Sequence, residues 1–191
     1  ASGPYNEQVE FGEIGGASVV NTITINGNGN VLTYEATLLA APGTLVLNGT
    51  DYMNVNNLIV NGTGATYALV CHLWNNADNN TFTNCTFNAP ANGTGSSQVP
   101  FSITGSATSP TVSGLSGSNN IITGCTMFSG ARGITLYGNS AGSNTGNQVI
   151  NCDIRDQYNY ATTFLYQDGL IFRGNTLDRP TRTTLTTYYG I

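Results

Sequence analysis

The chain has 191 residues, of which 39% are hydrophobic and only 8% are charged; it contains no lysine, and its formal net charge is −5. Hydrophobic residues at this level in a regular pattern can build a core, which excludes a disordered polyanion. Scarce cations argue against binding to nucleic acid or to an anionic membrane, because both need clustered positive charge. No apolar stretch approaches the roughly 20 residues of a membrane span, so we expect no direct membrane insertion. No signal segment opens the chain, and we therefore interpret it as mature sequence.

A repeated pattern organises the chain. Three segments follow Asn-x-(Phe/Ile/Val)-x-(Asn/Gly)-Cys-x-(Phe/Met/Ile), and two more fit the same frame of apolar residues at period two around a kink. Period two predicts two short strands that meet at a turn, and Asn84, Gly124 and Asn151 at the turn tolerate a left-handed backbone. Such repeats are typical of solenoids. In chain order the five segments are Met53–Val60, Asn80–Phe87, Asn120–Met127, Asn147–Ile154 and Leu170–Leu177.

A third strand is expected in each repeat. Three strands per repeat without helical periodicity predict one coil per repeat, with each strand stacked in parallel on its counterpart in the next coil. The predicted fold is all-β, a right-handed parallel β-helix of about six to seven coils that forms a single domain over residues 1–191. Residues 88–100 and 106–118 are expected to be long loops, which explains one longer repeat. The expected third strands are Tyr67–Leu73, Phe101–Gly105, Gly133–Tyr137 and Thr162–Tyr166.

The cysteines fall into the repeat frame. Cys85, Cys125 and Cys152 share one inward column, where a thiol serves as a small buried hydrophobe, and this interpretation is favoured over a disulfide between coils. Cys71 and His72 are adjacent on a strand and therefore point to opposite faces, so they cannot form a nucleophile and base pair. With a single histidine in the chain, a zinc site is not expected, and no metal or cofactor is predicted.

One charged cluster is the best candidate for catalysis. Lyases and hydrolases on this fold need carboxylates, and a lyase would add calcium and a basic residue. The offset that places Cys152 over Asn175 also places Arg155 over Asp178, which favours an exposed ladder of ion pairs instead. The same offset places Asp156 over Arg179. The catalytic candidates are Asp153, Arg155, Asp156, Asp178 and Arg179.

Aromatic residues give a second set of candidates, for ligand binding. Rings in a row on stacked coils can bind the faces of sugars, although such rings also simply pack on each other. Long loops on a rigid solenoid are common recognition sites, so we expect a site between the two loops and the strands at Phe101 and Gly133. The ligand-binding candidates are Trp74, Phe101, Arg132, Tyr137 and Tyr166.

The opening residues 3–11 and 21–28, together with the later Asn-x-x-Phe-x-Asn-Cys units, resemble the pectate-lyase-like β-helix modules of large exported surface proteins of Bacteroidota. The resemblance implies export to the cell surface by the type IX pathway, and neighbouring domains in a larger parent chain of which these residues are an excerpt. It also implies an opening strand over about residues 5–14 that covers the N-terminal end. It does not specify an activity, since lyases, hydrolases, adhesins and spacers share such coils.

The function expected from these observations is that of a non-catalytic secreted or cell-surface module, adhesin-like or carbohydrate-binding, that displays itself toward an extracellular glycan. The alternative is a polysaccharide lyase or glycoside hydrolase that acts on acidic polysaccharide. A third interpretation is an inert structural spacer.

Overall fold

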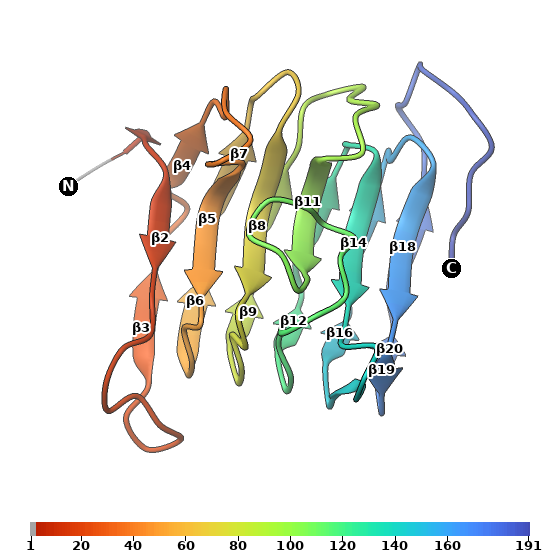
Figure 1. Cartoon of the computed structure of the whole chain (residues 1–191). Helices are drawn as coiled ribbons and strands as arrows, with labels where there is room; N and C mark the ends of the chain where they lie inside the picture. The colour runs from red at the N-terminus through yellow and green to blue at the C-terminus, as the bar shows by residue number, and fades with distance from the viewer. Residues whose placement is uncertain (1–2) are drawn as a thin grey trace.

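The computed structural model describes residues 3–191, and within this range the regular structure consists of β-strands alone (Figure 1). The strands form three parallel sheets in which each strand pairs with the strand one coil earlier and one coil later. This arrangement confirms the predicted right-handed parallel β-helix, with three strands per coil and six or seven strands per sheet.

Sheets A, B and C form the three sides of the solenoid, and a short pair of strands lies beside them. Sheet A contains β1 (Tyr5–Asn6), β4 (Val31–Tyr34), β7 (Ile59–Gly62), β10 (Thr86–Asn88), β13 (Thr126–Phe128), β17 (Asp153–Arg155) and β21 (Thr176–Asp178). Sheet B contains β2 (Val9–Phe11), β5 (Gly43–Asn48), β8 (Ala68–Trp74), β11 (Gln98–Ile103), β14 (Arg132–Tyr137) and β18 (Tyr160–Leu165). Sheet C contains β3 (Ile23–Asn26), β6 (Met53–Asn56), β9 (Thr81–Thr83), β12 (Ile121–Thr123), β16 (Gln148–Ile150) and β20 (Ile171–Arg173). The short pair is β15 (Asn144–Thr145) and β19 (Gln167–Asp168).

The strand registers confirm the repeat frame. Residues that share a place in the repeat lie directly over one another in neighbouring coils, so each apolar column runs along the solenoid axis and fills its interior. In sheet C the column is Val55, Phe82, Ile122, Val149 and Phe172. In sheet A it is Val60, Phe87, Met127, Ile154 and Leu177.

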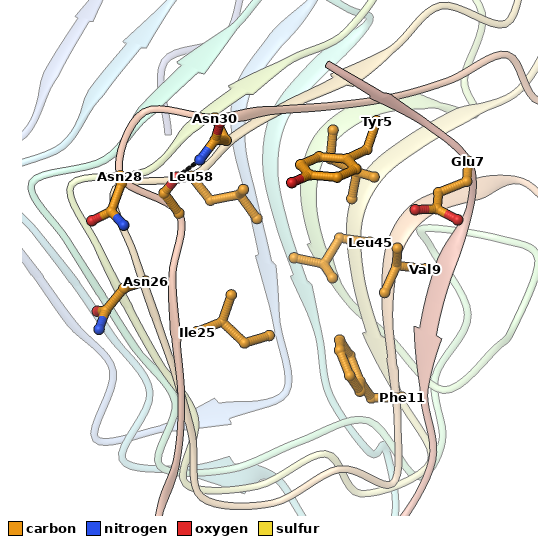
Figure 2. Close-up of a pocket in the computed structure, with 12 residues that line it drawn as sticks. Tyr5, Glu7, Val9, Phe11, Ile25, Asn26, Asn28, Asn30, Leu45 and Leu58 are labelled. Carbon is orange, nitrogen blue, oxygen red and sulfur yellow. Dashed lines mark hydrogen bonds between the residues drawn. The ribbon is translucent and has the colours of Figure 1, made fainter. Parts of the chain in front are cut away.

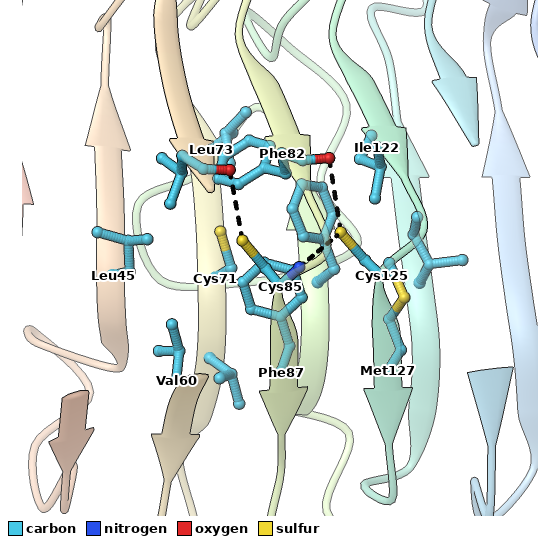
Figure 3. Packing of buried hydrophobic residues seen from close by; sticks show 14 of the residues in the cluster. Leu45, Val60, Cys71, Leu73, Phe82, Cys85, Phe87, Ile122, Cys125 and Met127 are labelled. Atoms are coloured by element: carbon cyan, nitrogen blue, oxygen red, sulfur yellow. Dashed lines mark hydrogen bonds between the residues drawn. The ribbon is translucent and has the colours of Figure 1, made fainter. Parts of the chain in front are cut away.

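The interior is closely packed around aromatic rings and thiols (Figure 3). The rings of Phe82, Phe87 and Phe101 meet edge to face, with centroids 5.1 to 6.0 Å apart. Cys71, Cys85 and Cys125 are buried beside them, and the four cysteines of the chain are free. Edge-to-face contact of this kind adds about 0.5–1.5 kcal/mol per pair beyond the area that the rings bury.

The turn between sheets C and A has the predicted left-handed backbone. The φ angles of Asn84, Gly124 and Asn151 are +53°, +63° and +52°. Glycine occurs where the asparagine of the previous coil leaves no room: a Cβ atom on Gly124 would lie 2.5 Å from Asn84 Oδ1, and one on Gly174 would lie 2.2 Å from Asn151 Oδ1. The alternation of asparagine and glycine therefore has a steric cause as well as a conformational one.

The corner between sheets B and C contains a ladder of buried asparagines. The Oδ1 atom of Asn120 accepts the backbone N–H of Asn80 at 3.0 Å, and Asn147 Oδ1 accepts that of Asn120 at 2.9 Å. Each Nδ2 group donates to a backbone carbonyl, such as Ala77 O for Asn120 at 2.9 Å. The ladder satisfies backbone groups that the corner would otherwise leave unpaired inside the protein.

Residues 5–14, the expected N-terminal cap strand, contain β1 and β2. β1 and β2 pair in parallel with β4 and β5, so they extend sheets A and B as edge strands of a first coil. At the other end, Tyr189 forms an isolated parallel bridge with Tyr160, the first residue of β18 in sheet B.

Candidate functional site

The charged cluster predicted from sequence is brought together at the C-terminal coils. Arg155 lies over Asp178 in the register of sheet A, as predicted. Its ion pair, however, is with Asp153 two residues earlier on the same strand. The two residues are on the same face of the strand because successive side chains alternate. Arg155 therefore pairs with Asp153 and not with Asp178, the partner that the register predicted.

Asp156 has a structural environment that the ladder interpretation did not foresee. Its carboxylate is buried, and its two oxygens accept hydrogen bonds from the backbone N–H groups of Thr181 and Arg182, both at 2.8 Å, and from Thr181 Oγ1 at 2.6 Å. Arg179 instead donates to Tyr158 O at 3.1 Å. Asp156 therefore anchors the C-terminal segment and does not pair with Arg179 in an exposed ladder.

Arg182 completes this anchor. Its buried guanidinium donates to the carbonyls of Gly130 at 3.1 Å, Asp156 at 2.8 Å and Gly93 at 2.8 Å. It thereby joins the C-terminal segment to the loop before β11, across several coils. Residues 179–188 carry no repeat signature, so sequence reasoning had no frame in which to place Arg182 above Asp156.

His72 lies on the outer face of sheet B, as its strand position predicts, but it is buried under the loop after β11, which contacts it through Ser106. Its Nε2 atom lies 2.8 Å from Ser106 O, and its Nδ1 atom lies 2.8 Å from Ser102 Oγ. A carbonyl only accepts, so Nε2 carries the proton and Nδ1 accepts the Ser102 hydroxyl. Burial lowers the pKa of His72 to about 4. His72 and Ser102 are both shielded from solvent, and the hydrogen bond from His72 to Ser106 fixes the loop after β11 to the sheet.

The exposed part of the same face carries two groups of tyrosines. Tyr160 stacks on Tyr189, with ring centroids 5.1 Å apart and planes at 17°, and the guanidinium of Arg132 lies 4.7 Å from the centre of the Tyr160 ring. Farther along the strands, Tyr137 meets Tyr166 edge to face, with centroids 6.1 Å apart. We call these five residues, Arg132, Tyr137, Tyr160, Tyr166 and Tyr189, the tyrosine strip.

The two groups of the strip are separated along the strands. Arg132 and Tyr137 are the first and last residues of β14, which places them about 16 Å apart at the usual rise per residue. Tyr166 and Tyr189 are the most exposed members, at 42% and 50%. Arg132 Nη1 donates to Thr163 Oγ1 at 3.4 Å, and partial burial lowers the pKa of Arg132.

The remaining ligand-binding candidates lie elsewhere. Phe101 is fully buried in the core between Phe82 and Phe87, so it does not line a surface site. Trp74 ends β8, which is separated from β14 by β11, and it does not join the tyrosine strip. Near the strands at Phe101 and Gly133, Val99, Ser102 and Thr135 are buried, and a hollow of about 440 Å³ lies beside the first loop, lined by residues 90–95 and Gln98.

A cavity of about 400 Å³ opens at the N-terminal end of the solenoid (Figure 2). Its walls are apolar and include Val9, Phe11 and Ile25, while Glu7 and Asn28 lie at its rim. The walls are the inward side chains of the first coils, which would face another coil elsewhere in the solenoid. The cavity is thus an open end of the core, with an acidic residue at its edge.

Among residues 3–191, no group of three or more His, Cys, Asp or Glu side chains is placed to hold a metal ion. The same range contains no helix that is long and apolar enough to cross a membrane. Comparison with known proteins finds no matching family model, no similar curated protein and no similar solved structure. The candidate site therefore rests on its geometry alone.

Proposed function

We propose that this chain is a non-catalytic, exported β-helix module that binds extracellular glycan at the tyrosine strip. The observation that carries the proposal is the pair of aromatic groups on one rigid, exposed face, with the partly exposed guanidinium of Arg132 at one end. Tyrosine combines an apolar ring with a hydroxyl that donates and accepts hydrogen bonds, and a sugar presents the complementary apolar face and hydroxyls.

Rigidity supports the same proposal. β14 and β18 are hydrogen-bonded along their lengths, and the ring contacts join one coil to the next. A ligand that binds across both tyrosine groups therefore meets side chains that are already held in place, which lowers the entropic cost of binding. The length of the strip suits a short run of a polymeric glycan better than a single sugar.

The cellular setting belongs to the proposal as well. The resemblance of the repeat units to Bacteroidota surface modules supports a secreted or cell-surface location, an adhesin-like role and export by the type IX pathway. Low charge and the absence of lysine are in keeping with an extracellular display scaffold that does not bind nucleic acid.

The charged cluster gives less support to an enzyme that acts on acidic polysaccharide. Asp153 is paired with Arg155, and Asp156 is buried and occupied by three hydrogen bonds from the C-terminal segment. Catalysis needs carboxyl groups that converge on a substrate, and two of the three candidate aspartates are engaged within the protein.

The test is a glycan-array screen of the chain, with parallel assays for unsaturated products and new reducing ends on uronate polymers, with and without calcium. Retention of a glycan without turnover is the expected result. Turnover would overturn the proposal and direct attention to Asp178 and its neighbours. If no glycan is bound and no product forms in any assay, the proposal is overturned in favour of a structural spacer.

A further inference from the structure

Residues 179–188, which we call the strap, connect β21 to Tyr189 outside the three sheets. Among residues 3–191, no backbone–backbone hydrogen bond involves the strap. The coils are fixed by backbone ladders, whereas the strap is fixed by hydrogen bonds to and from side chains. The position of the strap can therefore be changed by single substitutions that leave every ladder intact.

Two charged side chains fix the first half of the strap. The buried carboxylate of Asp156 accepts the backbone N–H groups of Thr181 and Arg182, both at 2.8 Å. The buried guanidinium of Arg182 donates to the carbonyls of Gly130 at 3.1 Å and Gly93 at 2.8 Å, which precede β14 and β11. Charge-assisted bonds of this kind are among the strongest hydrogen bonds in proteins. They dock the strap at the corner between sheets A and B.

The second half of the strap ends at Tyr189. The ring of Tyr188 packs against the core, and the guanidinium of Arg179 lies 4.6 Å from the centre of this ring. The next residue, Tyr189, accepts the N–H of Ala161 through its carbonyl at 2.8 Å and stacks its ring on Tyr160. A strap that leaves the corner moves the residues attached to it, so the place of Tyr189 depends on docking.

The docked strap thus completes one of the two aromatic groups of the tyrosine strip. Arg132 and Tyr160 belong to β14 and β18, whereas Tyr189 is placed by the strap. With the strap undocked, Tyr160 keeps the guanidinium of Arg132 and loses the stacked ring. An aromatic pair offers a sugar more fixed apolar surface than a single ring does, so this group binds more weakly without docking.

We propose that docking of the strap sets the affinity of the tyrosine strip for glycan, with Asp156 and Arg182 as positioning residues for Tyr189. This inference rests on the proposed function, because it concerns the regulation of the same site. In the docked state both aromatic groups of the strip meet the glycan. In the undocked state the strip keeps the group at the far end of β14 and loses the ring of Tyr189.

The first measurement is amide hydrogen exchange, followed by NMR, at Ala161, whose N–H donates to Tyr189 O. Arg182→Gln removes the guanidinium that docks the strap. Asp156→Gly removes the acceptor of the strap N–H groups and keeps the left-handed backbone, whose φ is +64°. Each variant should exchange the Ala161 amide at least about tenfold faster. The amide of Ile121, hydrogen-bonded in the middle coils, should keep its rate.

The second measurement is isothermal titration with a hexasaccharide of the glycan that the array retains most strongly. Arg182→Gln should weaken binding about as much as Tyr189→Ala, by roughly three- to tenfold, and the two changes together should weaken it no further. Arg182→Gln and Tyr166→Ala should instead add in free energy, because Tyr166 belongs to the other group. A general loss of stability would not produce this difference between the two pairs.

Two controls accompany these variants. Arg173→Gln makes the same change in charge on an exposed residue of β20 and should alter neither measurement. Asp156→Asn keeps an oxygen acceptor for the strap N–H groups and should restore slow exchange and tight binding. If Arg182→Gln also speeds exchange at Ile121, that variant is destabilised as a whole, and Asp156→Gly carries the test.

Three results would overturn the proposal. The first is an unchanged exchange rate at Ala161 in Asp156→Gly, and the second is a loss of affinity in Arg182→Gln that adds to the loss in Tyr189→Ala. The third is an array that retains no glycan, which overturns the proposed function as well. In that case the exchange rates still show separately whether the strap holds Tyr189, so the two failures are distinguishable.

Discussion

The backbone N–H of Cys152 donates to Asn175 Oδ1 at 2.8 Å. Two coils earlier, the N–H of Cys85 donates in the same way to the thiol of Cys125 at 3.4 Å. Asn175 also donates through Nδ2 to Val149 O at 2.9 Å. Cys85, Cys125, Cys152 and Asn175 occupy one inward column. This position requires a small side chain that accepts a hydrogen bond from the backbone of the previous coil, and both cysteine and asparagine meet this requirement.

A substitution at Asn175 tests this requirement. Asn175→Ala leaves the N–H of Cys152 and the carbonyl of Val149 without partners and should lower the free energy of unfolding by about 1–3 kcal/mol. Asn175→Cys restores the acceptor and should recover most of that loss. Urea denaturation measures both, with Asn54→Ala on the outer face of β6 as the control. Equal stability of Asn175→Ala and the unmodified chain would refute the role of the column.

The four thiols should be unreactive in the folded protein because all of them are buried. Burial raises the pKa of the Cys71 thiol, and hydrogen bonds with Cys152 and Cys85 together with burial raise that of Cys125, whereas the hydrogen bond with Cys125 lowers the pKa of Cys85 and of Cys152. Since a buried thiol is closed to the reagent, iodoacetamide at about pH 8 should leave the native chain unmodified. In urea all four cysteines should react, as mass spectrometry would record. Fewer than four labels in urea without a reducing agent would indicate a disulfide instead.

The steric relation between Asn84 and Gly124 predicts a coupled pair. Gly124→Ala places a Cβ against Asn84 Oδ1 in a left-handed backbone and should cost about 2 kcal/mol. Asn84→Gly in the same chain removes the contact and should recover part of the loss, which a double-mutant cycle would measure. The matched control is Gly142→Ala, where a Cβ meets nothing within 4 Å. Full additivity of the two changes would contradict a direct contact.

The buried His72 predicts a dependence of stability on pH. Its pKa is about 4 in the folded state, below its ordinary value of 6.5, so between these values the unfolded chain binds a proton that the folded chain does not. Stability from this residue is fully present above pH 6.5 and is lost as the pH falls to 4, by about 3 kcal/mol in total. The difference in unfolding free energy between the unmodified chain and His72→Gln, followed from pH 7 to 4.5, isolates this effect from the carboxylates. A constant difference would show that His72 titrates normally.

The fold could be predicted from the sequence because each coil repeats the same physical requirement. Period-two apolar residues and a left-handed turn at Asn84, Gly124 and Asn151 recur, so one register error would have disrupted every column. The candidate site was harder to predict from the sequence, because it depends on segments outside the repeat. Arg182 lies in a stretch without the pattern, and the covering of His72 depends on a loop path that spacing does not encode.

Phe101 illustrates the limit of reasoning by position. A strand beside two long loops was a reasonable place to expect a ligand site, yet Phe101 points inward, between Phe82 and Phe87. Its neighbour Ser102 points outward and lies under the loop with His72. The loop that was expected to form the wall of a groove covers His72 and Ser102 instead.

The glycan-binding role of the tyrosine strip can be tested most directly by isothermal titration with a glycan retained on the array. The chain is compared with Tyr166→Ala/Tyr189→Ala, which removes the most exposed ring of each group, and with Tyr34→Ala on sheet A as the control. We predict that the double variant binds at least about tenfold more weakly, while the control stays within about twofold. Unchanged affinity in the double variant would contradict glycan binding at this face.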